Sequence, residues 1–139
     1  MNTTGAKVVI DTNIFIAILG RKSPYRWIFD KIRNGELQLC VSSDILWEYE
    51  EILVQKTNKN VARNVIDFLL ISPNVHFVDV FYYWQLIEAD PDDNKFIDCA
   101  VASGADCIAS NDKHFNVLKT IDFPKLTILS LKEFEAKYK

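Results

Sequence analysis

The chain has 139 residues, of which 49% are hydrophobic and 25% charged, so we expect one globular domain spanning residues 1–139. No apolar run approaches the ~18 residues that span a bilayer, and the chain start lacks a signal peptide, which predicts a cytoplasmic protein with no membrane segment. The net charge of −3 argues against bulk electrostatic coating of nucleic acid, but it is compatible with an enzyme whose carboxylates hold metal ions.

In the first half of the chain, apolar runs of strand length alternate with helical repeats. Gly20 supplies a stop for the first helix, and Ser23 followed by Pro24 is typical of a helix start. The elements expected here are a strand at 7–10, a helix at 12–19, a helix capped by Ser23 that reaches Asn34, a strand at 37–41, a helix capped by residues 42–44, and a helix capped by Asn58 that ends at 72–74.

The second half continues the alternation. Gly104 is typical of a helix C-terminus, and Ser130 with Glu133 forms a capping-box pattern. The elements expected here are a strand at 75–80, a short helix opened by the aromatic segment 81–84, a helix whose apolar stripe includes Phe96 and Ala100, strands at 107–109 and 126–129, and a final helix after Ser130.

Strands that alternate with helices along the whole chain predict an α/β fold, with a parallel sheet covered by helices on both faces. In such sheets, ligands bind just beyond the carboxyl ends of the strands. Asp11 follows the first expected strand, and Asn111 and Asp112 follow the strand at 107–109. The edge of the sheet where these strands end is therefore the expected site.

Four acidic residues can converge on this edge: Asp11, Glu48, Asp93 and Asp112. Two carboxylates about 5 Å apart repel by roughly 3 kcal/mol at an effective dielectric near 20, so a cluster of them needs protons or a bound cation. Ligand sets made only of oxygen suit Mg²⁺ or Mn²⁺. The sequence thus predicts a site for one or two such ions, with the chemistry of water activation and phosphoryl transfer.

Each of these acids also has a structural interpretation. Asp92 and Asp93 stand at an expected helix start, where carboxylates commonly cap backbone N–H groups, and Asp112 could cap the segment after it. Glu48 and Glu50 lie on opposite flanks of one apolar stripe, so periodicity does not choose between them.

Cysteine and histidine give no competing metal site. Cys40, Cys99 and Cys107 lie in apolar segments without CxxC spacing, which predicts buried reduced thiols. His76 and His114 are isolated in the sequence, and we do not expect them to form a metal pair.

Three segments together resemble a known family. The strings VVIDTNIFIAIL, SSDILWEYEEIL and DPDDNKFIDCAVASGADCIASNDKHF, with the spacing between them, look like a PIN domain of the VapC-like subgroup identified as toxins of toxin–antitoxin pairs. The resemblance runs from Lys7 to the last strand. It implies a three-layer α/β/α fold with about five parallel strands and a metal-dependent ribonuclease that uses Mg²⁺ or Mn²⁺.

Matching the family motifs position by position places the first acid on Asp11, the helix acid on Glu48 and the last acid on Asp112. In many relatives the third acid would align with Asn94. Members of this subgroup usually carry DPDDN, so Asp93 is our candidate, and Asp98, one turn beyond Asn94, is the alternative.

Further candidate residues come from the resemblance and from their position beside the acids or after the first helix. Polar neighbours that help to hold the carboxylates are expected at Thr12, Asn13, Ser110 and Asn111. Basic or imidazole groups that are candidates for contacting RNA phosphates are Arg21, Lys22, Lys113 and His114.

The partners implied are an RNA substrate, an antitoxin protein that enters the acidic groove, and a second copy of the chain packed through its first helices. An alternative is a catalytically silent domain of this fold that binds RNA or protein. A phosphoryl-transfer enzyme with Asp11 as nucleophile is disfavoured because Asn13 stands where that chemistry usually has a second Asp.

Overall fold

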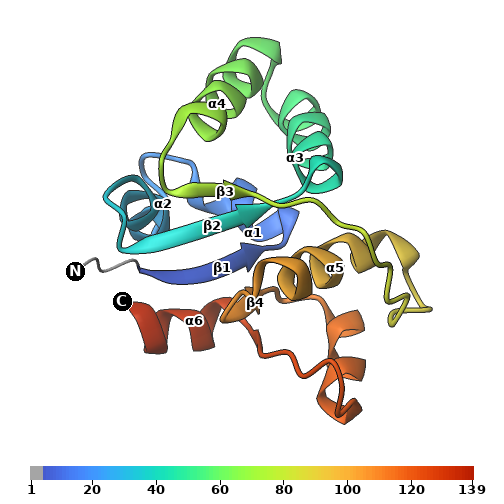
Figure 1. Ribbon diagram of the computed structural model, residues 1–139. Helices are drawn as coiled ribbons and strands as arrows, with labels where there is room; N and C mark the ends of the chain where they lie inside the picture. The colour runs from blue at the N-terminus through green and yellow to red at the C-terminus, as the bar shows by residue number, and fades with distance from the viewer. Residues whose placement is uncertain (1–4) are drawn as a thin grey trace.

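A computed structural model describes residues 5–139 and shows a five-stranded, wholly parallel sheet with strand order β3-β2-β1-β4-β5 (Figure 1). The strands are β1 (Ala6–Ile10), β2 (Leu37–Val41), β3 (Val75–Phe77), β4 (Cys107–Ala109) and β5 (Ile128–Leu129). The predicted α/β class, the parallel sheet and the number of strands are therefore confirmed.

Within residues 5–139, the strands are accompanied by six α-helices and two 3₁₀ segments. They are α1 (Thr12–Ile18), α2 (Arg26–Arg33), α3 (Ser43–Lys56), α4 (Lys59–Ile71), η1 (Pro91–Asp93), α5 (Asn94–Ser103), η2 (Lys113–Thr120) and α6 (Leu131–Tyr138). None of these helices has the length and apolarity needed to cross a membrane.

The helices cover both faces of the sheet and give the expected three layers. Helix α5 lies in front of the sheet in Figure 1 and packs against β1, β2 and β4. Helices α1 and α2 lie behind it, and α2 contacts β2. Trp27 of α2 stacks on Phe134 of α6, with ring centroids 6.2 Å apart, which ties the C-terminal helix to this layer.

Local sequence signals account for most helix ends. The side chains of Ser42 and Asn58 accept backbone N–H groups at the starts of α3 and α4. Gly104 ends α5 in the left-handed conformation with φ of 68°, where a side chain would be strained. The Ser130–Glu133 capping box is formed as predicted.

The predicted start of α2, with Ser23 as N-cap and Pro24 as first helical residue, is wrong by two residues. The helix begins at Arg26, and its N-cap, Tyr25, provides no side-chain cap. The hydroxyl of Ser23 instead donates to the Ala17 carbonyl at 2.6 Å and accepts from the Tyr25 amide at 3.1 Å. Ser23 therefore stabilises the turn between α1 and α2.

Two predicted strands are shorter in the structure. The expected strand at 75–80 ends at Phe77, with one further bond from the Val78 amide to the Val41 carbonyl at 2.9 Å. Strand β2 stops at Val41 because the next residue caps α3, so β3 has nothing further to pair with. The strand expected at 126–129 likewise begins only at Ile128, which pairs with Ile108 of β4.

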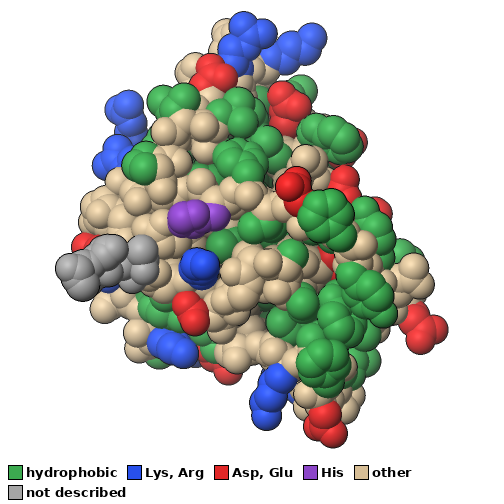
Figure 2. All heavy atoms as spheres, in the orientation of Figure 1, with side chains coloured by type: hydrophobic (Ala, Val, Ile, Leu, Met, Phe, Trp, Pro, Cys, Tyr) green, Lys and Arg blue, Asp and Glu red, His purple; other side chains and the backbone are tan. Residues whose placement is uncertain are grey.

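The predicted short helix at 81–84 does not form. The amide of Trp84 donates to the Asp98 carboxylate at 3.0 Å, and Gln85 adopts a positive φ of 53°, so the segment cannot make the bonds of a helical turn. Phe81, Tyr82 and Tyr83 are mostly exposed. Hydrophobic side chains gather accordingly at the lower right of Figure 2, over the segment between β3 and α5.

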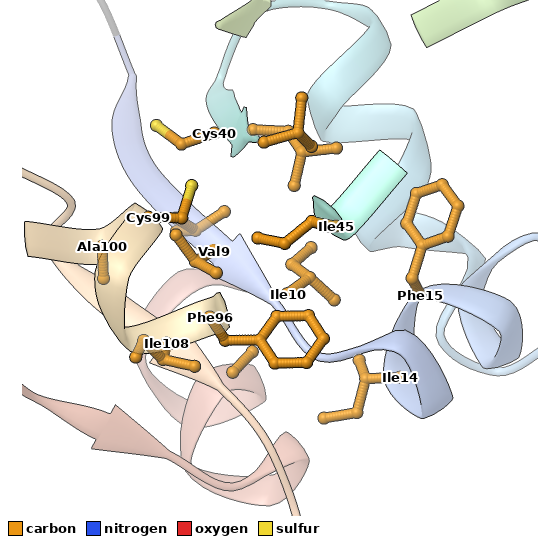
Figure 3. Packing of buried hydrophobic residues seen from close by; sticks show 14 of the residues in the cluster. Val9, Ile10, Ile14, Phe15, Cys40, Ile45, Phe96, Cys99, Ala100 and Ile108 are labelled. Atoms are coloured by element: carbon orange, nitrogen blue, oxygen red, sulfur yellow. The ribbon is translucent and has the colours of Figure 1, made fainter. Parts of the chain in front are cut away.

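The core lies between the sheet and its helices. Figure 3 shows Val9 and Ile10 of β1 converging with Ile45 of α3 and with Phe96 and Cys99 of α5, and all five are fully or almost fully buried. Every predicted thiol is buried and free, and burial raises the pKa of Cys99 to about 12. Strand β1 is thus held in the core up to its last residue, Ile10, and Asp11 follows directly as the N-cap of α1.

Candidate active site

The register of β1 and β4 brings the first and last acidic segments together. Ile10 pairs with Ala109, and the amide of Asp11 donates to the Ala109 carbonyl at 3.0 Å. The next residue of the second segment, Ser110, donates its hydroxyl to Asp11 Oδ2 at 2.6 Å. The same hydroxyl accepts from the Asp112 amide at 3.0 Å, so one serine joins two acids.

Asp11 is a buried carboxylate, only 7% exposed. Burial raises its pKa, more than the hydrogen bonds from Ser110 and Asn13 lower it, and the charges of Asp112 and Glu48 raise it further. Asp11 also caps α1 through the Asn13 amide at 3.4 Å. It therefore acts as a helix cap while it lies among the other acids.

Asp93 is buried as well, being 9% exposed, and its side chain caps no backbone N–H of α5. Burial raises its pKa to about 6, despite the hydrogen bond with His114, and Asp112, Asp90 and Asp11 add to the increase. The side-chain cap in this segment is Asp90, the N-cap of η1, which accepts from the Asp92 amide at 3.2 Å. The structural interpretation of Asp93 as a cap is thus not supported.

His114 faces this acidic cluster. Its Nδ1 lies 3.3 Å from Asp93 Oδ2, 3.3 Å from Asp112 Oδ1 and 3.9 Å from Asp90 Oδ2. Ligand atoms of Asp90, Asp93 and His114 lie within 4.8 Å of one another, a spacing that could hold a metal ion. Sequence reasoning missed Asp90, whose only signal was its position as an N-cap before Pro91.

Glu48 lies beside Asp11, whereas Glu50 is exposed to solvent. The hydroxyl of Thr12 donates to Glu48 Oε2, and Lys95 Nζ donates to Glu48 Oε1 at 2.6 Å. The neighbouring Tyr49 is fully buried and donates its hydroxyl to the Ile10 carbonyl, directly before Asp11. The structure therefore places Glu48, and not Glu50, near the other acids, a distinction that the helical period could not make.

Asp98 and Asn94 lie apart from these acids. Asp98 Oδ1 accepts from the Trp84 amide, and its side chain lines a separate pocket of about 820 Å³ with Asp44, Lys95 and other residues. The amide side chain of Asn94 binds the backbone of Ile87 twice, at 2.9 and 3.0 Å. Both residues therefore hold the segment between β3 and α5.

The remaining predicted residues surround the acids or lie on the surface. Asn111 Oδ1 accepts from the Leu131 amide at 2.9 Å and so fixes the start of α6. Arg21, Lys22 and Lys113 are exposed. A smaller pocket of about 250 Å³ opens above Asp11, and the other residues that line it are Asn13, Ile14, Ala17, Asn111, Asp112 and Leu131.

The donor set suits a hard divalent cation. Asp11, Asp93 and Asp112 present carboxylate oxygens at one edge of the sheet. Burial, with a smaller contribution from mutual repulsion, raises the pKa of Asp11 and Asp93. A divalent ion would replace that repulsion by attraction. The residues present therefore fit Mg²⁺ or Mn²⁺, and His114 adds a nitrogen ligand that Mn²⁺ accepts more readily.

The sequence of residues 7–114 matches the family model described as the PIN domain. The chain belongs to the PIN domain family. This match covers most of the chain, and it includes all the acids described above. Together with the acidic cluster, membership of the family supports a nuclease as the class of activity.

Solved structures agree on the PIN fold at low sequence identity. The VapBC2 complex of Rickettsia felis bound to a promoter DNA fragment includes a chain with 19% identity and a TM-score of 0.61, and the match covers 89% of this chain and 98% of that one. The DNA-bound VapBC complex of Salmonella typhimurium gives 18% identity, a TM-score of 0.57 and coverage of 90% and 98%.

A third similar structure is VapC20 of Mycobacterium tuberculosis, a toxin that cleaves the sarcin-ricin loop. It shares 14% identity and a TM-score of 0.56, with 78% of this chain and 92% of that chain covered. No curated protein matches the chain in sequence. At these identities the structural similarity supports the fold of this PIN domain.

Proposed function

We propose that this PIN domain is a metal-dependent endoribonuclease and the toxin of a toxin–antitoxin pair. The observation that supports it most directly is the meeting of Asp11, Asp93 and Asp112 at the carboxyl edge of the sheet in a chain of this family. The ribonuclease assignment and the toxin role draw on the family and on the VapC proteins of similar fold.

The residues have distinct roles in this proposal. Asp11, Asp93 and Asp112 hold Mg²⁺ or Mn²⁺. Ser110 orients the Asp11 carboxylate through its hydroxyl and accepts the backbone amide of Asp112. When bound, the divalent ion supplies a Lewis acid that lowers the pKa of water and neutralises phosphoryl charge. Glu48 lies beside Asp11 with its carboxylate oriented by Thr12 and Lys95.

Basic groups around the site are the proposed contacts to RNA phosphates. Lys113 adjoins Asp112, and Arg21 and Lys22 follow α1; all three are exposed. Such contacts position the backbone without reading sequence. The imidazole of His114 is directed at the acids. We therefore assign His114 a role in the acidic cluster and not in contacting RNA phosphates.

The test is cleavage of a single-stranded RNA by the purified protein with Mn²⁺, Mg²⁺ or EDTA. Asp11→Asn removes one carboxylate, and Glu50→Gln is the matched control because Glu50 is an exposed acid on the same helix as Glu48. Cutting that needs metal, survives in the control and disappears in Asp11→Asn supports the proposal. Equal activity in wild type and Asp11→Asn contradicts it.

A catalytically silent domain remains the second candidate, because one of the four acids, Glu48, already has both carboxylate oxygens bound by protein groups. That function predicts RNA binding without cleavage in any metal. The same assay, with binding measured beside cutting, separates the two.

The toxin role has its own test in bacterial cells. Expression of the wild-type chain should arrest growth, expression of Asp11→Asn should not, and co-expression of an antitoxin should restore growth and yield a co-purifying complex. A homodimer, proposed through the first helices, is tested by the molar mass of the purified protein in solution.

A further inference from the structure

Lys95 and Glu48 form a tight and largely buried ion pair next to the acidic cluster. Lys95 Nζ lies 2.6 Å from Glu48 Oε1, and the two side chains are only 16% and 25% exposed. The other carboxylate oxygen, Oε2, accepts the Thr12 hydroxyl. Both oxygens of Glu48 are thus bound by groups of the protein.

The position of Lys95 in its helix is electrostatically unfavourable. Lys95 is the second residue of α5, and a cation in the first turn opposes the partial positive charge of a helix N-terminus. Burial of its ammonium adds a desolvation cost. A lysine here is stabilised by Glu48 from α3, a residue 47 positions away in the chain.

The other acids of the site have no such partner. Within residues 5–139, the only basic side chain within ion-pair distance of Asp93 or Asp112 is His114, and Asp11 forms no ion pair. The negative charge of the site is therefore divided into two parts. Glu48 has a cation of the protein, whereas the carboxylates of Asp11, Asp93 and Asp112, with Asp90 and His114 beside them, are left to bind one from solution.

We propose that Lys95 is a built-in cation that occupies the place of a second metal ion at Glu48, so that the site binds a single divalent ion. That ion is held by Asp11, Asp93 and Asp112, and Glu48 is not its ligand. This inference rests on the proposed function, because it specifies the metal content of the same site.

The experiment is a titration of the purified full chain with Mn²⁺, in which the EPR signal of the free ion gives the number bound per chain. Lys95→Met removes the ammonium and keeps the apolar stem, Lys95→Arg keeps the charge, and Glu48→Gln combined with Lys95→Met removes both partners. Thermal unfolding followed by circular dichroism verifies that each variant is folded.

We expect one Mn²⁺ for wild type and for Lys95→Arg, two for Lys95→Met, and one for the double variant. Two ions in the wild type, or one ion in a folded Lys95→Met, overturns the inference while the nuclease proposal stands. If Lys95→Met does not fold, a count of two ions in the wild type still overturns the inference. A wild type that binds no Mn²⁺ overturns the proposed function and this inference together.

Discussion

The hydroxyl of Ser110 donates to Asp11 Oδ2 at 2.6 Å, although 99 residues separate the two in the chain. The contact exists because β1 and β4 are neighbours with Ile10 opposite Ala109. Ser110 also accepts from the Asp112 amide. A single hydroxyl therefore binds the carboxylate of the first acid and the backbone of the last acid.

Ser110→Ala should weaken Mn²⁺ binding by about 10- to 100-fold, as is common when a group that orients a metal ligand is removed. The variant keeps all the acids, so the loss would come from their orientation. Equilibrium titration with Mn²⁺ measures it. Ser103→Ala is the matched control, because the Ser103 side chain contacts the Ala100 carbonyl and the Cys40 thiol and not the acids of the site. Equal affinity in Ser110→Ala and wild type would contradict the assigned role.

The variants Asp93→Asn and Asp98→Asn should differ sharply in their rates of RNA cleavage. Asp93→Asn removes an acid of the cluster, and we expect RNA cleavage to fall by about a hundredfold or more. Asp98→Asn keeps an oxygen that can accept from the Trp84 amide, and cleavage should stay within about threefold of wild type. Initial rates on one RNA at saturating Mn²⁺ compare the two. The opposite ranking would make Asp98 the third acid of the site.

Metal binding should weaken in acid because of Asp93. Its pKa is raised to about 6 by burial and by Asp112, Asp90 and Asp11, against the opposing hydrogen bond with His114. Below that pH a proton competes with the ion for the carboxylate, so Mn²⁺ affinity should fall about tenfold for each further pH unit. Titrations at pH 7.5, 6 and 5 measure the slope. A flat profile would show that Asp93 does not bind the ion.

The raised pKa of Asp93 also affects the stability of the metal-free protein. The folded-state pKa of Asp93, about 6, lies above its ordinary value of 3.8. Stability from this residue is therefore fully present below about 3.8 and is lost as the pH rises through 6. Asp93→Asn should remove this loss, so its melting temperature in EDTA should exceed that of wild type at pH 7.5. A variant less stable than wild type at that pH would contradict the sign.

Asn94 should prove to be a structural residue. Its side chain donates to the Ile87 carbonyl at 3.0 Å and accepts from the Ile87 amide at 2.9 Å. Asn94→Ala leaves these groups unpaired and should cost about 1–3 kcal/mol in urea unfolding. Asn94→Asp places a carboxylate against the carbonyl and should also destabilise without raising cleavage. Asn64→Ala, on the exposed surface of α4, is the control. Higher activity in Asn94→Asp would instead mark this position as a metal site.

The sequence by itself determined the class of fold. Runs such as Val8 to Ile10 have strand length, and signals such as Gly104 and Ser130 have one local physical meaning, so they predicted element ends that the structure confirms. The expectation of an acidic site after β1 and β4 also came from local order, because parallel strands end at the same edge of a sheet. The family resemblance added the PIN fold, which the family match confirms.

Only the tertiary structure decided which polar residues meet. Helical period could not separate Glu48 from Glu50, and it gave no reason to connect Lys95 with either. The helix predicted at 81–84 failed because Asp98, from another element, binds the Trp84 amide. Contacts of this kind depend on strand register and helix packing between distant segments, and no local pattern encodes them. The sequence supplied the acids, whereas the register of β1 and β4 and the packing of α3 beside α5 decided which groups each acid contacts.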